Sequence, residues 1–306
     1  MTSKNWKDFL LSSGLPLEHC VAQILKKAGV LGGGEFIYQR RNELNILTQF
    51  SVDIYSSYIL GDRLWIDFLI ECKYRHDSAK WVFTPNEYKT FFGPEFNHAF
   101  LVLDDLADDY KIDTESIDKF SKLYKLCSKG TELLSNNCNP KSIENAISQL
   151  KYAVPHRITD AMIHQIDKEL GKISPIFITI PIIVTTAELW RIRPEITMDD
   201  VRAADDLRQV AEQEEVLIIH QQPDNELRQY SHKLFTDSFD RDQQERISKI
   251  MKTREKHSFR FFADVYSTYF PSMFVVVQFG RFEKAIHNVI KFFSQSKHFK
   301  RRGNDR

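Results

Sequence analysis

The chain has 306 residues, of which 42% are hydrophobic and 27% are charged, and its formal net charge at pH 7 is zero. This composition is typical of a globular protein with one large domain or two ordinary ones, and zero net charge argues against a protein that coats nucleic acid, because such binding rests mainly on neutralised phosphates. No apolar stretch reaches the roughly 20 residues needed to cross a bilayer, and residues 1–11 lack the apolar segment of a signal peptide. We therefore expect a cytoplasmic protein with no membrane partner.

The first hundred residues alternate between helical and extended patterns. Apolar residues recur at helical spacing until Gly29 and the glycines at 32–34, which end the predicted helix. Two alternating runs then flank a turn signal at 60–63, which predicts a β-hairpin whose first strand has Phe50, Val52 and Ile54 on one face. The expected elements are a helix at 15–28, strands at 36–40, 50–58 and 64–74, a helix near 85–92 and a strand at 99–103.

The rest of the chain changes character twice. Residues 104–171 look helical, polar and free of strands, and strand patterns return after Pro175. The expected elements are helices at 115–127, 142–152, 158–170, 198–213, 241–257 and 282–293, with strands at 176–185, 187–192, 216–220 and 273–279. This pattern predicts an α/β core at 1–110, a helical segment at 111–171 and a second α/β region at 172–306. The second region either forms its own domain or closes back on the first sheet.

The residues that indicate chemistry lie on the predicted hairpin. Residues two apart on a strand point to the same face, so Glu71 and Lys73 project together, and Asp53 on the preceding strand stands beside Glu71 if the hairpin pairs as drawn. Two converging carboxylates, with the carbonyl oxygen of Cys72, would suit a hard divalent ion such as Mg²⁺. Lys73 would then orient or deprotonate a water molecule, or neutralise a phosphate.

A simpler arrangement explains the same residues. An ion pair between Glu71 and Lys73 would also satisfy a partly buried carboxylate. Asp67 shares the predicted face of Glu71, but four residues along a strand separate them by about 13 Å, which is too far to share one ion. Arg75 lies just beyond the triplet, where it either grips phosphates or ends the strand in solvent.

The run from Gly14 to Arg75 resembles the PD-(D/E)xK superfamily of restriction-endonuclease-like nucleases, in particular the Mrr-like members. The resemblance rests on a helix that carries Glu18 and ends at Ala28-Gly29, on Tyr38, on the strand segment Ser-Val-Asp-Ile that contains Asp53, and on the phrase IECKYR that contains Glu71 and Lys73. It implies a mixed central sheet flanked by helices, Mg²⁺ or Mn²⁺ as cofactor, Asp53 and Glu71 as metal ligands, Lys73 as the catalytic lysine and Glu18 as a carboxylate that approaches the metal. The chain departs from the motif at Val52, where a proline would stand, and the resemblance covers about a quarter of the chain.

The resemblance implies an endonuclease that hydrolyses phosphodiester bonds, with double-stranded DNA as the expected substrate by analogy alone. Restriction or phage defence would be its role, with partner proteins of a defence system. An alternative is a catalytically inactive module that binds nucleic acid or supports an assembly; another is a C-terminal half that senses or oligomerises. Cutting both strands calls for two chains, so a homodimer is expected. The apolar face of the helix at 282–293 either packs on the core or forms the dimer contact.

Overall fold

The computed structural model describes helices and strands throughout the chain. The described residues are 6–41, 44–61, 63–86, 101–103, 106, 110–112, 124–134, 137–139, 141–166, 175–252, 258–295 and 299–301. The helices are α1 (Trp6–Ser12), α2 (Leu15–Lys27), α4 (Lys141–Ile166), α5 (Met198–Ala203), α6 (Asn225–Ser238), α7 (Arg241–Lys252), α8 (Phe259–Tyr269) and α9 (Phe282–Phe293), with 3-10 turns at Leu207–Gln209 and Phe279–Arg281. The strands are β1 (Leu31–Arg41), β2 (Leu47–Leu60), β3 (Leu64–Lys73), β4 (Lys80–Pro85), β5 (Leu101–Leu103), β6 (Tyr110–Ile112), β7 (Lys125–Leu134), β8 (Asn137–Asn139), β9 (Ile176–Thr185), β10 (Glu188–Ile192), β11 (Ala211–Glu214), β12 (Val216–His220), β13 (Met273–Gln278) and β14 (Phe299–Arg301).

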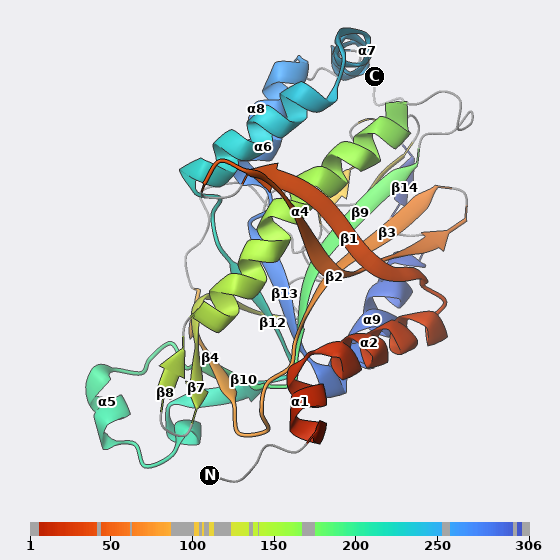
Figure 1. Ribbon diagram of the computed structural model, residues 1–306. Coiled ribbons are helices and arrows are strands. Elements are labelled where there is room, and N and C mark those ends of the chain that lie inside the picture. Colours follow the sequence, from red (N-terminus) through yellow and green to blue (C-terminus); the bar gives the residue numbers. More distant parts are fainter. Residues whose placement is uncertain are drawn as a thin grey trace.

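A twelve-stranded mixed sheet combines strands from both halves of the chain (Figure 1), and β6 and β14 pair in a separate two-stranded sheet. The order of the larger sheet is β1-β2-β3-β9-β13-β12-β7-β4-β10-β11, with β5 on β9 and β8 on β7. β1, β2 and β3 form an antiparallel meander, and β9 then pairs parallel to β3 along all ten residues from Leu64 to Lys73. Strands from the expected second α/β region therefore lie in the same sheet as the hairpin. The expected α/β class, with a mixed central sheet flanked by helices, is confirmed.

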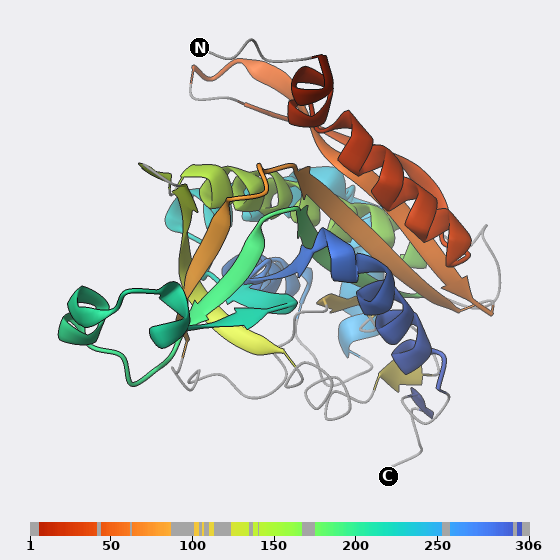
Figure 2. The ribbon, with the colours of Figure 1, turned by 90° about the horizontal axis from the view of Figure 1, so that it is seen from below.

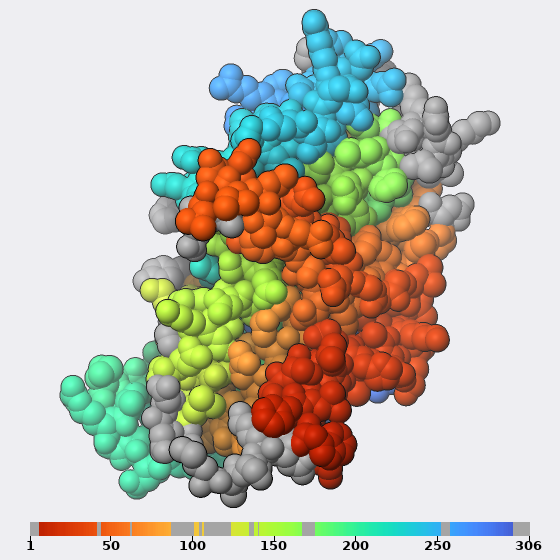
Figure 3. Space-filling view, viewed as in Figure 1, coloured from red at the N-terminus to blue at the C-terminus, as the bar shows by residue number. Residues whose placement is uncertain are grey.

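The helices cover the two faces of this sheet, and the apolar core divides accordingly. One cluster lies between the sheet and helices α4, α6 and α8, and the other lies under α2 and α9, which run side by side (Figure 2). The β1–β2 hairpin lies across α4, so that α4 emerges on either side of it in the space-filling view (Figure 3). None of the described helices is long and apolar enough to cross a bilayer.

The alternation expected for β3 is confirmed, whereas that for β2 is wrong. On β3, Ile70 packs in the α2–α9 cluster and Leu69 in the α4 cluster. On β2, however, Val52 faces α4 while Ile54 faces α2 and α9, so the two do not share a face. The reason is a β-bulge: the two-residue step from Gly34 to Phe36 on β1 stands opposite a three-residue step on β2. An extra residue reverses the side to which later side chains point.

The expectation of a helical, strand-free segment at 111–171 is wrong in part. Residues 115–123 and 167–170 of its expected helices lie outside the described residues, but Lys125–Leu134 is strand β7, which pairs with β4, β12 and β8. Gly130 weakened the strand signal, yet a Cβ there would lie 2.5 Å from the ring of Phe83, so the close approach of β4 needs glycine. The two expected helices beyond it form one helix, α4, which continues through Pro155.

The middle of the second half also differs from expectation. The helix expected at 198–213 ends at Ala203 and gives way to a 3-10 turn and edge strand β11. Helices α6 and α8 were not expected, whereas α7 begins at Arg241 as expected. The strand near 99–103 is described at Leu101–Leu103, and the helix expected near 85–92 falls largely on residues 87–100, outside the described residues.

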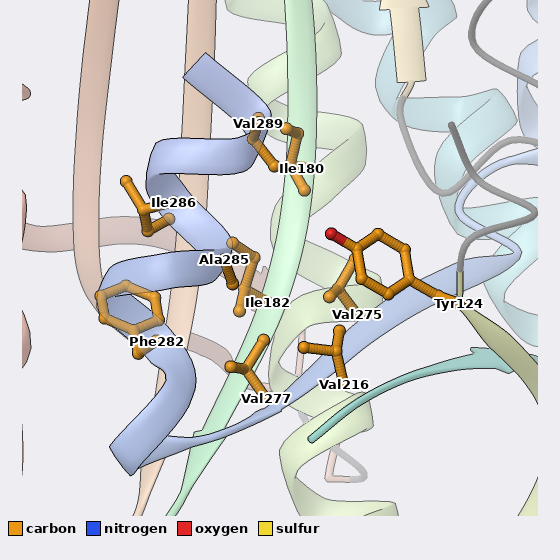
Figure 4. A pocket seen from close by; sticks show the side chains of 10 residues that line it. All are labelled: Tyr124, Ile180, Ile182, Val216, Val275, Val277, Phe282, Ala285, Ile286 and Val289. Carbon is orange, nitrogen blue, oxygen red and sulfur yellow. The ribbon is translucent and has the colours of Figure 1, made fainter. Parts of the chain in front are cut away.

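Helix α9 packs against the sheet rather than presenting a free apolar face. Its residues Phe282, Ile286, Val289 and Phe293 are buried, so intramolecular packing, one of the two roles expected for it, is confirmed. A small apolar cavity of about 20 Å³ remains between α9 and strands β9, β12 and β13, and Tyr124 points its hydroxyl group toward it (Figure 4). This volume holds about one water-sized group.

Candidate functional site

The candidate site lies in the fork where β2 and β3 separate. Their pairing extends only to Ile54 opposite Ile70, so the last three residues of β3 continue beyond it. The bulge of β2 lies at this point. Asp53 bridges the fork, because its Oδ2 accepts a hydrogen bond of 2.7 Å from the backbone N–H of Cys72. A side-chain carboxylate thus takes the place of a backbone partner and is fixed beside β3.

Glu71 and Lys73 project toward α4. The ammonium group of Lys73 donates to Oε1 of Glu71 and, at 3.0 Å, to the side-chain oxygen of Gln149 on α4. The side chain of Glu71 is 0% exposed and that of Lys73 is 20% exposed. Oε2 of Glu71 is buried and accepts no hydrogen bond from any described residue. Buried polar atoms are nearly always partnered, so this oxygen is a candidate contact for a cation or a water molecule.

The raised pKa values of Glu71 and Asp53 also favour a positive charge at this position. Burial raises the pKa of Glu71 to about 7, Lys73 lowers it, and the nearby carboxylate of Asp53 raises it. Burial also raises the pKa of Asp53, although the amide of Cys72 and the ammonium of Lys73 oppose the rise. The single ammonium group of Lys73 therefore stabilises the ionised forms of two largely buried carboxylates. A further cation would favour their ionised forms.

Glu18 reaches the same region from another layer. It lies in the first turn of α2, and its pKa is raised by burial and then by the negative charge of Asp53. Its Oε1 lies where a Cβ on Gly14 would be only 3.2 Å away, so the side chain folds back toward the start of the helix. Gly14 has φ of 83°, which glycine adopts without strain. The structure thus brings Glu18 within electrostatic reach of Asp53.

The carbonyl group of Cys72 completes the predicted donor set. Within a strand, the N–H and C=O groups of one residue point to the same side. Because the N–H of Cys72 bonds to Asp53 and the carbonyl of Lys73 bonds to Thr185, the carbonyl of Cys72 is directed toward the fork. Two carboxylates, a carbonyl and water are oxygen ligands of the kind that Mg²⁺ prefers. The described residues contain no group of three or more His, Cys, Asp or Glu side chains arranged to hold a metal.

Three neighbours of the site were not expected from the sequence. Gln149 holds Lys73 from a position 76 residues further along the chain, and the hydroxyl of Tyr38 donates to the backbone carbonyl of Gln149 at 3.1 Å. Glu35, exposed on β1, raises the pKa of both Asp53 and Glu18. No motif marks Gln149 or Glu35, and the resemblance includes Tyr38 without giving it a role; only the folded arrangement of the hairpin and α4 brings these residues here.

Two charged residues near the triplet have partners of their own. Arg75 does not end the strand in solvent, because its Nε lies 2.6 Å from Oε2 of Glu132 and also donates to Ser142. Asp67 pairs with Arg157, whose Nη2 lies 2.6 Å away. The Arg75 pair joins the segment after β3 to β7 and α4, the Asp67 pair joins β3 to α4, and Asp67 is not part of the candidate site.

Comparison of the chain with protein-family models, with curated proteins and with solved structures finds no match.

The raised pKa of Glu71 predicts an unusual pH dependence of stability. The carboxyl group of Glu71 stays protonated up to about pH 7 in the folded protein, whereas in the unfolded chain it loses its proton near pH 4.5. The stabilising contribution is therefore fully present below pH 4.5 and is lost as the pH rises through 7. As the pH rises from 4.5 to 7, the free energy of unfolding of Glu71→Gln should increase relative to that of the parent, by on the order of 3 kcal/mol in total. Urea unfolding in EDTA at several pH values measures this difference.

The matched control is Glu212→Gln, which removes an exposed carboxylate from β11. Its free energy of unfolding should follow that of the parent across the pH range. If the Glu71→Gln curve also runs parallel to the parent curve, the burial of an unpartnered carboxylate oxygen is contradicted.

Proposed function

We propose that this protein is a metal-dependent nuclease that hydrolyses phosphodiester bonds, with DNA as its expected substrate. The observation that carries the proposal is the convergence of Asp53, Glu71 and Lys73 in the β2–β3 fork, around a buried Glu71 oxygen without a partner. A carboxylate oxygen buried in this way costs free energy unless a charge offsets it. An ion pair with Lys73 engages only Oε1 of Glu71 and leaves Oε2 unpaired.

The protein's own groups have separate tasks in this proposal. Asp53 and Glu71 hold the ion, with the carbonyl of Cys72 as a further ligand and Glu18 approaching from α2. When bound, Mg²⁺ or Mn²⁺ supplies electrostatic stabilisation of the charge that develops on the phosphate. Lys73, held by Gln149, places an ammonium group at the reacting phosphate or its attacking water. The choice of DNA, and a role in restriction or phage defence, rest on the resemblance of residues 14–75 to restriction-endonuclease-like nucleases.

Metal dependence tests the proposal. Cleavage of DNA should require Mg²⁺ or Mn²⁺ and should vanish in EDTA, whereas Ca²⁺ should support binding better than cleavage because its coordination is looser. Full activity in chelator would show that the mechanism is wrong.

A measurement independent of activity tests the ligands. Mn²⁺ should raise the melting temperature of the parent, because an ion that binds only the folded state stabilises it. The shift should be lost in Asp53→Asn and in Glu71→Gln, and it should be kept in Glu212→Gln, which lies on the far edge of the sheet. Metal binding and DNA binding without any cleavage would instead identify an inactive nucleic-acid-binding module.

A further inference from the structure

Strand β1 forms one end of the sheet and leaves a long open edge. It has 11 residues, and among the described strands it pairs only with β2. Its alternate residues Glu35, Ile37, Gln39 and Arg41 are all exposed, and 54% of Ile37 is accessible. Proteins usually shorten, charge or cover such an edge, because its unpaired N–H and C=O groups recruit another strand.

The opposite end of the sheet shows the usual protection. Edge strand β11 has four residues, Ala211–Glu214, and carries two glutamates. It offers little backbone for pairing, and its like charges would repel a second copy of the same strand. The two ends of the sheet therefore differ, because β1 lacks the protection that β11 has.

We propose that β1 pairs with β1 of a second copy of this chain, antiparallel, about a two-fold axis at Tyr38. In this register Glu35 lies opposite Arg41 of the other copy, and the symmetry makes the same pair a second time. Ile37 lies opposite Gln39, also twice. Cross-strand pairs of opposite charge stabilise a sheet, and a closed two-fold contact uses the same surface on both copies.

The charged residues of β1 favour a second copy of this chain as the binding partner, and they favour pairing about Tyr38. An axis at Ile37 would place Glu35 opposite Gln39 and Arg41 opposite Gly33, so no charge would be matched. Arg41 donates one N–H to the carbonyl of Asn45 at 2.7 Å, but its guanidinium group has five donors, so it can still pair with a carboxylate. β1 carries its own extra residue between Gly32 and Gly34, which limits the regular paired segment to residues 35–41. A strand of unrelated sequence would not reproduce this reciprocal match.

The pairing would also bring the two candidate sites near each other. Asp53 lies on β2 beside the 34–36 segment of β1. From the rise along a strand and the three spacings between strands that separate them, the two Asp53 residues would be about 25 Å apart. That two chains then act on one duplex rests on the proposed function, whereas the dimer itself does not.

Sedimentation of the full chain at micromolar concentration tests the dimer without reference to activity. We expect a species of twice the 35.9 kDa chain mass. Glu35→Arg and Arg41→Glu should each place like charges opposite one another twice and should weaken dimerisation roughly tenfold to a hundredfold. The double variant Glu35→Arg/Arg41→Glu exchanges the charges and should restore the dimer.

The control is Glu212→Arg on β11, which should dimerise like the parent. Circular dichroism establishes that each variant is folded, and exposed positions make misfolding easy to avoid. A strictly monomeric parent would overturn the proposal. So would a dimer that both single variants leave unchanged, or a folded double variant that stays monomeric. Loss of cleavage in a variant that still dimerises would bear on the proposed function and not on this interface.

Discussion

Lys73→Ala should reduce the proposed nuclease activity by roughly 10²–10⁴-fold, while the protein remains folded. The side chain is partly exposed, and it donates hydrogen bonds to Glu71 and Gln149. Without the lysine, Glu71 can take up a proton, because its pKa is already about 7. Steady-state cleavage of a DNA substrate, with circular dichroism on the same samples, measures the effect.

Two further variants frame this result. Lys73→Arg should also be poor, because a planar guanidinium group does not replace a compact ammonium. Lys26→Ala removes an exposed lysine from α2 and should cleave at the parent rate. A folded Lys73→Ala protein with the parent cleavage rate would refute the assignment of the catalytic lysine.

Arg157→Ala should destabilise the protein by about 3–5 kcal/mol, because it leaves a buried carboxylate without its cation. Asp67 is 0% exposed and Arg157 is 4% exposed, and Nε and Nη2 of the arginine lie 2.9 and 2.6 Å from Oδ2 of the aspartate. The guanidinium group also lies over the rings of Tyr55 and Phe177. Urea unfolding at neutral pH gives the change in free energy.

The double variant Asp67→Leu/Arg157→Met is the informative comparison. It removes both charges and keeps apolar volume, so it should recover much of the lost stability. Arg241→Ala breaks the exposed pair with Glu245 on α7 and should change stability little. If Arg157→Ala were as mild as Arg241→Ala, the carboxylate of Asp67 would have to be protonated or reached by water.

The periodicity of apolar residues was sufficient to predict those elements that pack against the core along one regular face. Strand β12 and helix α9 begin and end at the expected residues, 216–220 and 282–293, because each presents a regular apolar pattern to the core. The Glu71–Lys73 pair was predictable for the same reason, since residues two apart on a strand share a face. Contacts between distant segments carried no such signal, and Gln149 was therefore missed.

Tertiary packing accounts for the remaining errors. Helix α4 continues through Pro155 because it is buried on nearly all sides, between the sheet, the hairpin and α6, so packing outweighs the cost of a proline. The bulge in β2 reverses the faces of its side chains, although nothing in residues 50–58 announces an extra residue. Asp53 nevertheless reaches β3, because the bulge lies where the two strands part.

Because β3 pairs with β9, the chain makes β3 long before it makes the parallel strand that lies beside β3 in the sheet. The carbonyl of Lys73 accepts a hydrogen bond from Thr185, which lies 112 residues later in the chain. At roughly 5–20 residues per second, synthesis of that interval takes on the order of ten seconds. During this time the emerging chain already contains Asp53, Glu71 and Lys73, but β3 lacks the neighbour that fixes it in the sheet. A nascent chain therefore carries the triplet well before β9 has been made, and a chain truncated before Pro175 lacks the strand that holds β3 in the sheet.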